Sequence, residues 1–220
     1  MQISKWYRLT IISLLLLIVG CNEGNKQGSS TGTTEKRREV DSNNSMTAKP
    51  VLTGGTTVLK VNQTILEILK SQNLSALFQH IHPERGIRFS PYGFIDTVKH
   101  KHFTAAQFKA AIQGIEKIKW GQYDGSGEEI LLNCKDYFTR FVYNKDFLNA
   151  EKKSFNNTIG RGNSLNNLAA VYPGLPFVEN YFSGFEKKYE GMDWCSLTLV
   201  FAKWEQTYYL VGMVHDQWTI

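Results

Sequence analysis

A carboxylate near the end of the chain, Asp216, is the group best suited to acid–base chemistry. Alternation over residues 194–219 predicts two long antiparallel strands joined by a two-residue turn at Glu205-Gln206. In that register Asp216 falls on the apolar face, where burial raises the pKa of a carboxyl group and suits it to general acid or base work. The alternative is a structural salt bridge to Arg88 or Arg85, which is the more common role for such a group.

A cysteine and a histidine on the same two strands, Cys195 and His215, suggest a nucleophile and its base. The predicted register places them on opposite faces of the hairpin, and this separates them. A β-bulge would bring them to one face, so a Cys195–His215 dyad is not excluded. A thiol buried in the core is the favoured interpretation of Cys195.

Two pairs of histidines are spaced like ligands on a strand: His80 with His82, and His100 with His102. Two ligands do not complete a zinc site, and His80 and His82 diverge if they lie on a helix. We therefore expect no metal. No cofactor is expected either, because the chain lacks Gly-x-Ser-x-Gly, His-Glu-x-x-His and glycine-rich nucleotide loops.

The first 20 residues are typical of an export signal. Lys5 and Arg8 precede an apolar run from Leu9 to Val19, which is too short to span a bilayer comfortably. Ile18-Val19-Gly20-Cys21 resembles the lipobox of bacterial lipoproteins, which implies cleavage before Cys21 and acylation of its thiol. The expected location is the cell membrane or outer membrane, with a lipid anchor and the domain on the extracytoplasmic side.

An oxidising compartment permits disulfides, so Cys134 and Cys195 form either a bridge or two buried thiols. Residues 21–57 are polar and low in large apolar side chains, which predicts a flexible linker. The formal charge of the chain is +5, but only about +2 remains for residues 51–220, so we expect no nucleic acid partner.

Hydrophobic periodicity predicts one α+β domain over residues 58–220. Helical stripes occur around Ile65 and Leu77 with a break at residues 71–73, and Thr104 and Asn133 are good N-caps for two later helices. Strands are expected at 86–90, 118–123, 177–185, 194–204 and 208–219, and residues 154–168 as a long loop or broken helix.

The order of these elements resembles the NTF2-like (cystatin-like) fold over roughly residues 60–220. The segments 82–92 (HPERGIRFSPY) and 208–220 (YYLVGMVHDQWTI) resemble parts of uncharacterised bacterial lipoproteins. The resemblance implies helices packed on a curved, mostly antiparallel sheet, a cone with a pocket inside. That fold carries isomerases, dehydratases, ligand-binding modules and dimerisation domains, so it does not select a function.

The predicted function is binding of a small ligand or an envelope protein by a membrane-anchored domain; a homodimer is one form of this. The alternative is an NTF2-like enzyme, of the isomerase, dehydratase or hydrolase type, with Asp216 as its acid or base. The candidate cleft residues are Arg88, Tyr92, Asp216 and Trp218. The space above Leu197, Leu199 and Phe201 should discriminate between a ligand or substrate pocket and a protein-interaction domain. Large helix side chains in that space would leave no pocket and favour protein–protein interaction.

Overall fold

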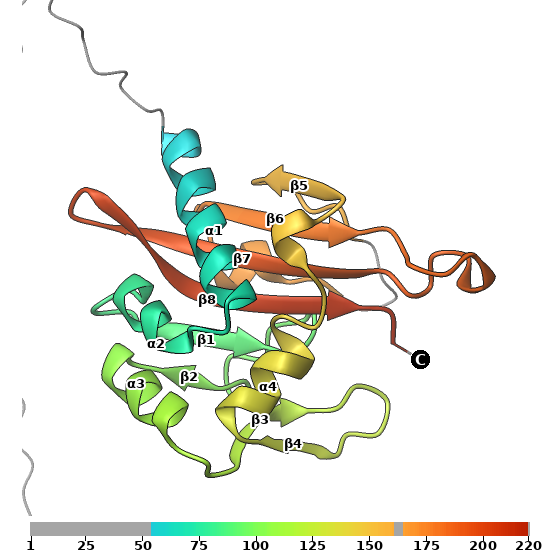
Figure 1. The fold of residues 1–220 in the computed structure, drawn as a ribbon, viewed down its shortest axis with the longest axis horizontal. Helices are drawn as coiled ribbons and strands as arrows, with labels where there is room; N and C mark the ends of the chain where they lie inside the picture. Colours follow the sequence, from blue (N-terminus) through green and yellow to red (C-terminus); the bar gives the residue numbers. More distant parts are fainter. Residues whose placement is uncertain (1–53, 161–164, 220) are drawn as a thin grey trace, which may run out of the picture. The chain divides into compact units, whose positions relative to one another are not determined.

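A six-stranded sheet is the framework of the domain (Figure 1). The computed structural model describes residues 54–160 and 165–219. The strand order is β2-β1-β8-β7-β6-β5, antiparallel throughout except for the parallel pair β1–β8. The strands are β1 (Ile87–Ser90), β2 (His102–Phe103), β5 (Lys152–Phe155), β6 (Phe177–Phe182), β7 (Cys195–Trp204) and β8 (Thr207–Gln217).

Helices cover one face of this sheet. They are α1 (Gly54–Lys70), α2 (Leu74–Leu77), α3 (Ala105–Gln113) and α4 (Cys134–Phe141), with short 3₁₀ turns η1 (Phe78–His80) and η2 (Phe147–Asn149). In Figure 1, α1 and α4 lie in front of the sheet. The expected caps are present: Thr104 makes a capping box with Gln107, and the Asn133 side chain accepts from the Asp136 N–H.

A separate hairpin, β3 (Ile118–Gln122) with β4 (Glu129–Leu132), packs beside α4. The opposite face of the six-stranded sheet is covered by α5 (Leu168–Val171) and neighbouring loops, and η3 (Lys187–Tyr189) lies between β6 and β7. The predicted fold class is confirmed as an α+β domain with helices on a mixed, mostly antiparallel sheet.

The β7–β8 hairpin decides which side chains face the helices. The predicted pairing of Trp204 with Thr207 is confirmed and continues to Phe201 with Leu210. Val200 then pairs with Gly212, so Val211 is an extra residue, a β-bulge, and the predicted register is wrong beyond this point. Every later residue of β8 changes face.

The two faces can now be defined. The inner face, toward the helices, carries Leu197, Leu199, Met213 and His215; the outer face carries Ser196, Thr198, Val214 and Asp216. Large hydrophobic side chains fill the inner core. Fully buried examples are Ile65, Leu66, Leu77, Phe89, Phe108, Trp120, Tyr137, Phe147 and Phe201.

Some short elements were missed or misjudged from the sequence. β2, β4, β5 and α5 have four residues or fewer, too short for periodicity to identify. The predicted 177–185 strand ends at Phe182, two residues before Gly184, whose φ of +145° no extended L-residue adopts easily. The helix after Thr104 ends at Gln113, which leaves Ile115 exposed.

The proposed signal peptide, Cys21 and nearly all of the 21–57 linker lie outside the described residues. Within the described ranges, no helix combines the length and apolar character needed to cross a membrane.

Candidate functional site

The four predicted cleft residues do not meet at one site. Arg88 lines a depression beside β2, Tyr92 lines a neighbouring one beside the β3–β4 hairpin, and Trp218 lines a third near η3. Asp216 is on the outer face of the sheet. Asp216 and Trp218 were placed on the apolar face by the predicted hairpin register, which the bulge at Val211 interrupts.

Asp216 is held by backbone donors on the outer face, where it is 8% exposed. Its Oδ1 accepts from the N–H of Gly93 at 3.2 Å and of Gln217 at 3.0 Å. A side chain at position 93 would place its Cβ only 2.4 Å from Asp216 Oδ2, so glycine is required there for this approach. Arg88 instead donates to the carbonyls of Thr97 and His100.

Cys195 and His215 share the inner face, contrary to the predicted register. Burial lowers the pKa of His215 to about 4, although its bond to the Pro91 carbonyl acts in the opposite direction. Burial raises the pKa of Cys195 to about 12, so the thiol stays protonated at neutral pH. In the described part of the chain His215 Nε2 has no hydrogen-bond partner. A thiol that is neutral and not hydrogen-bonded to its base is not an activated nucleophile.

Cys134 and Cys195 are free and buried. Of the two alternatives predicted from the sequence, a disulfide bridge or two buried thiols, the structure has the second. Cys134 starts α4 and Cys195 starts β7, and each lies within the hydrophobic core. Burial also raises the pKa of Cys134 to about 12.

Three of the four paired histidines organise turns. His82 Nδ1 accepts from the N–H groups of Glu84 and Arg85, and His102 Nε2 lies 2.8 Å from the Arg85 carbonyl. His100 Nδ1 accepts from the Asp96 N–H and lies 2.8 Å from Ser90 Oγ. Across residues 54–160 and 165–219 no three His, Cys, Asp or Glu side chains come together as a metal site.

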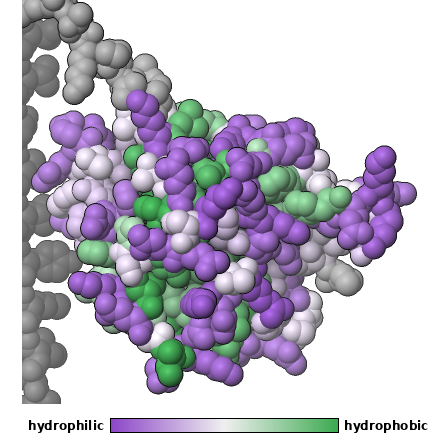
Figure 2. Space-filling view, viewed as in Figure 1, coloured by the Kyte–Doolittle hydropathy of each residue, from purple (hydrophilic) through white to green (hydrophobic). Residues whose placement is uncertain are grey.

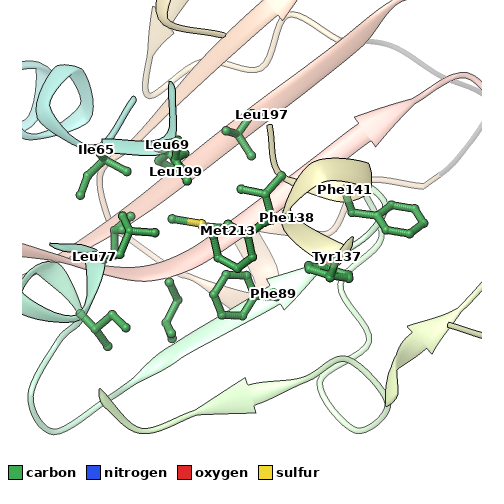
Figure 3. Close-up of a cluster of buried hydrophobic side chains, with 14 of the residues drawn as sticks. Ile65, Leu69, Leu77, Phe89, Tyr137, Phe138, Phe141, Leu197, Leu199 and Met213 are labelled. Carbon is green, nitrogen blue, oxygen red and sulfur yellow. The ribbon is translucent and has the colours of Figure 1, made fainter. Parts of the chain in front are cut away.

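The space above Leu197, Leu199 and Phe201 is filled. All three are fully buried, and Figure 3 shows Leu69 of α1 and Phe138 of α4 in the same hydrophobic cluster as Leu197 and Leu199. Helix α4 contributes the predicted aromatic stripe, of which Tyr137 stacks on Trp120 with ring centroids 3.8 Å apart. The four depressions identified among the described residues are not lined by these three strand residues.

Few polar groups are buried against this inner core. Asn62 of α1 and Asn180 of β6 exchange two side-chain hydrogen bonds of 3.2 Å, which fixes α1 on the sheet. The Tyr137 hydroxyl, in the described part of the chain, has no partner, and burial raises its pKa well above the usual value.

A depression of about 500 Å³ outside the core gathers positive charge. We call it the basic depression and define it by Arg88 of β1, Lys99 and Lys101 of the β1–β2 loop, and Lys119 of β3. None of these lysines was singled out from the sequence, because they are spread over three segments and the domain's net charge is small.

The loop that carries Lys99 and Lys101 is stabilised by hydrogen bonds within the loop. Asp96 Oδ1 accepts from the N–H groups of Val98 and Lys99 at 2.9 Å, and these bonds keep the pKa of Asp96 below its usual value. Burial, reinforced by the nearby Arg88 and Lys99 charges and opposed by Asp96, lowers the pKa of His100 to about 4. His100 is therefore a neutral wall of the depression at pH 7.

Comparison with known proteins gives little. No protein-family model matches the chain, and no curated protein matches it. A solved chain titled Rd1NTF2_05, with five substitutions in its title, is similar at a TM-score of 0.30 and 12% identity, over 72% of this chain and 96% of that one. No family follows from these comparisons, so function is argued from the residues.

Proposed function

We propose that this chain is a lipid-anchored envelope protein whose α+β domain binds a ligand or partner at its surface and is not an enzyme with its reaction site inside the cone. The anchor is inferred from the lipobox-like Ile18-Val19-Gly20-Cys21. The resemblance of segments 82–92 and 208–220 of the chain to parts of uncharacterised bacterial lipoproteins agrees with this proposal.

The observation that carries the binding function is the filled inner face. An enzyme of the NTF2-like type would need space between the sheet and its helices, where α1 and α4 side chains pack against Leu197 and Leu199 instead. Asp216, the proposed acid or base, faces the other way. These observations favour binding at the surface of the domain. Figure 2 shows that the helix-bearing side is mostly hydrophilic, with scattered hydrophobic patches.

The anchor is tested by substituting Cys21→Ser in the full chain in its host. We expect the protein to leave the membrane fraction or to remain unprocessed, because no thiol is left to acylate. Cys134→Ser is the matched control and should fractionate like the wild type. Unchanged membrane association and acylation of Cys21→Ser would rule out the lipoprotein assignment.

The site of binding is tested by native mass spectrometry of the full chain after incubation with an envelope extract. Tyr137→Phe and His215→Gln each change a buried side chain that has a polar atom without a hydrogen-bond partner in the described part of the chain, and neither removes much volume. We expect both variants to retain whatever component the wild type retains. Loss of that component in either variant, with an unchanged melting temperature, would move the site inside the cone. The same spectra show whether the chain forms a homodimer.

A further inference from the structure

We propose that the basic depression binds a multiply charged oxyanion of the phosphate type. This rests on the proposed function and deepens it, since it names the ligand class of a surface site. Arg88, Lys99, Lys101 and Lys119 line the depression, and no Asp or Glu is part of its lining. Four cations around one hollow are a large local excess for a domain with a formal charge of about +2.

Arg88 gives the site a fixed donor at its base. It is half-buried on β1, and its Nη1 donates to the carbonyls of Thr97 and His100, each at 2.9 Å. Those two bonds use one nitrogen of the guanidinium, and in the described part of the chain its Nε and Nη2 make no hydrogen bond. A guanidinium held in this way is preorganised for the oxygens of a phosphate group.

The lysines have only weak competing partners. Lys99 Nζ donates to the side-chain oxygen of Gln122 at 2.9 Å, and Lys101 Nζ lies 5.1 Å from the centre of the Phe103 ring. Lys119 pairs with Glu129, but both side chains are about half exposed, so this ion pair is worth little. Each lysine can therefore turn toward an anion at small cost.

Asp96 keeps its negative charge beside the depression but is not part of the lining. Its Oδ1 accepts from the N–H groups of Val98 and Lys99, which builds the turn that presents Lys99. His102 is exposed at the edge, and its Nε2 is engaged with the Arg85 carbonyl. The turn, the arginine and the lysines thus form one surface feature assembled from β1, the β1–β2 loop and β3.

The test uses the full chain with Cys21→Ser, so that the lipid does not contribute. Inorganic pyrophosphate is titrated calorimetrically at an ionic strength of about 0.1 M into this protein and into a Lys99→Gln/Lys101→Gln/Lys119→Gln variant. The matched control is Lys60→Gln/Lys187→Gln/Lys203→Gln, which removes the same charge from exposed positions elsewhere. Arg88 is left unchanged because its substitution would also break two loop contacts.

We expect the depression variant to weaken pyrophosphate binding about tenfold or more and the control to change it by less than about twofold, since screening confines each lysine's effect to about 10 Å. A second arm measures binding to vesicles of phosphatidylcholine with and without phosphatidic acid, whose phosphomonoester can carry more than one negative charge. Stronger binding to the anionic vesicles than to pyrophosphate, lost in the same variant, identifies a lipid headgroup as the source of the phosphate; the reverse order identifies a soluble phosphate.

Equal weakening in both triple variants, or no binding to either probe, would overturn the proposal. Either result would leave the anchor and interior-variant tests of the proposed function untouched, because those do not involve the three lysines.

Discussion

The inner and outer faces of the six-stranded sheet are built from the same strands yet carry different chemistry. Leu197 and Leu199 point to a dry core of aromatic side chains, while Ser196 and Thr198, their neighbours on β7, point to a face that also buries Glu179 and Asp216. Glu179, 2% exposed, accepts from the Ile159 and Gly160 N–H groups. The outer face therefore satisfies its carboxylates with loop backbone, whereas the inner face excludes nearly all polar groups.

The Val211 bulge sets this division for the last third of the hairpin. If β8 kept Val211 but paired without a bulge, His215 and Met213 would leave the inner core and Asp216 would enter it. A bulge thus decides whether a carboxylate lies among loop amides or among leucine and phenylalanine side chains. Four experiments test whether the two faces differ in this way.

Insertion of one alanine between Gly212 and Met213 should have the largest effect. Unless the strand loops out a second residue, every later residue of β8 changes face and Asp216 turns to the inner face, where an unpaired carboxylate is costly. We expect the free energy of unfolding to fall by more than about 4 kcal/mol, measured by urea denaturation. Val211→Ala keeps the bulge and the length of β8 and should cost no more than about 2.5 kcal/mol. Similar losses for the two variants would mean that the number of residues in β8 does not assign the faces.

Truncation of neighbouring β7 residues compares the two faces directly. Leu199 and Val200 are both fully buried, Leu199 in the inner core and Val200 in the smaller outer cluster. We expect Leu199→Ala to lower the free energy of unfolding by about 3–5 kcal/mol and Val200→Ala by about 1–3 kcal/mol. The difference should exceed what the one extra methylene of leucine explains, since aromatic rings on the helices cannot close the cavity. A larger loss for Val200→Ala would reverse the ranking.

Acid should destabilise the inner face through His215. Its folded pKa of about 4 lies below the unfolded value of about 6.5, so the unfolded state binds the proton first and stability falls as pH drops from 6.5 to 4. The slope is about 1.4 kcal/mol per pH unit for one histidine, and His100, also with a pKa of about 4, adds a similar contribution.

Denaturation at pH 7, 5.5 and 4.5 measures this slope. His215→Gln should remove about half of it and leave the His100 contribution in place. A slope unchanged by this substitution would show that the His215 ring is protonated or solvated in the folded protein.

Removing the Tyr137 hydroxyl should have the smallest effect. The group has no partner in the described part of the chain, so Tyr137→Phe should change the free energy of unfolding by less than about 1 kcal/mol, toward stabilisation. Tyr143→Phe is the control: its hydroxyl bonds Asp146 and the Leu148 N–H, and we expect a loss of about 1–2 kcal/mol. A loss above about 2 kcal/mol for Tyr137→Phe would indicate a bound water or ligand and contradict a dry interior.

The amino-acid sequence by itself determined the fold class, the helix caps at Thr104 and Asn133, the aromatic stripe of α4 and the hairpin turn at Glu205-Gln206. These features are local: a cap, a turn or a stripe needs only residues within one element, and periodicity reports which side of that element is apolar.

Three features depend on tertiary packing and could not be predicted from the sequence. They are the bulge at Val211, the filled inner face and the position of Arg88, Lys99 and Lys119 around one depression. The apolar residues around Val211 fit either register, so alternation alone could not reveal the extra residue. Packing selects the register that buries Met213 and His215 and keeps the Asp216 carboxylate near backbone donors. The basic depression arises because β1 pairs with β2 and also contacts β3, where the Lys101 N–H donates to the Trp120 carbonyl, and no single-element pattern encodes that approach.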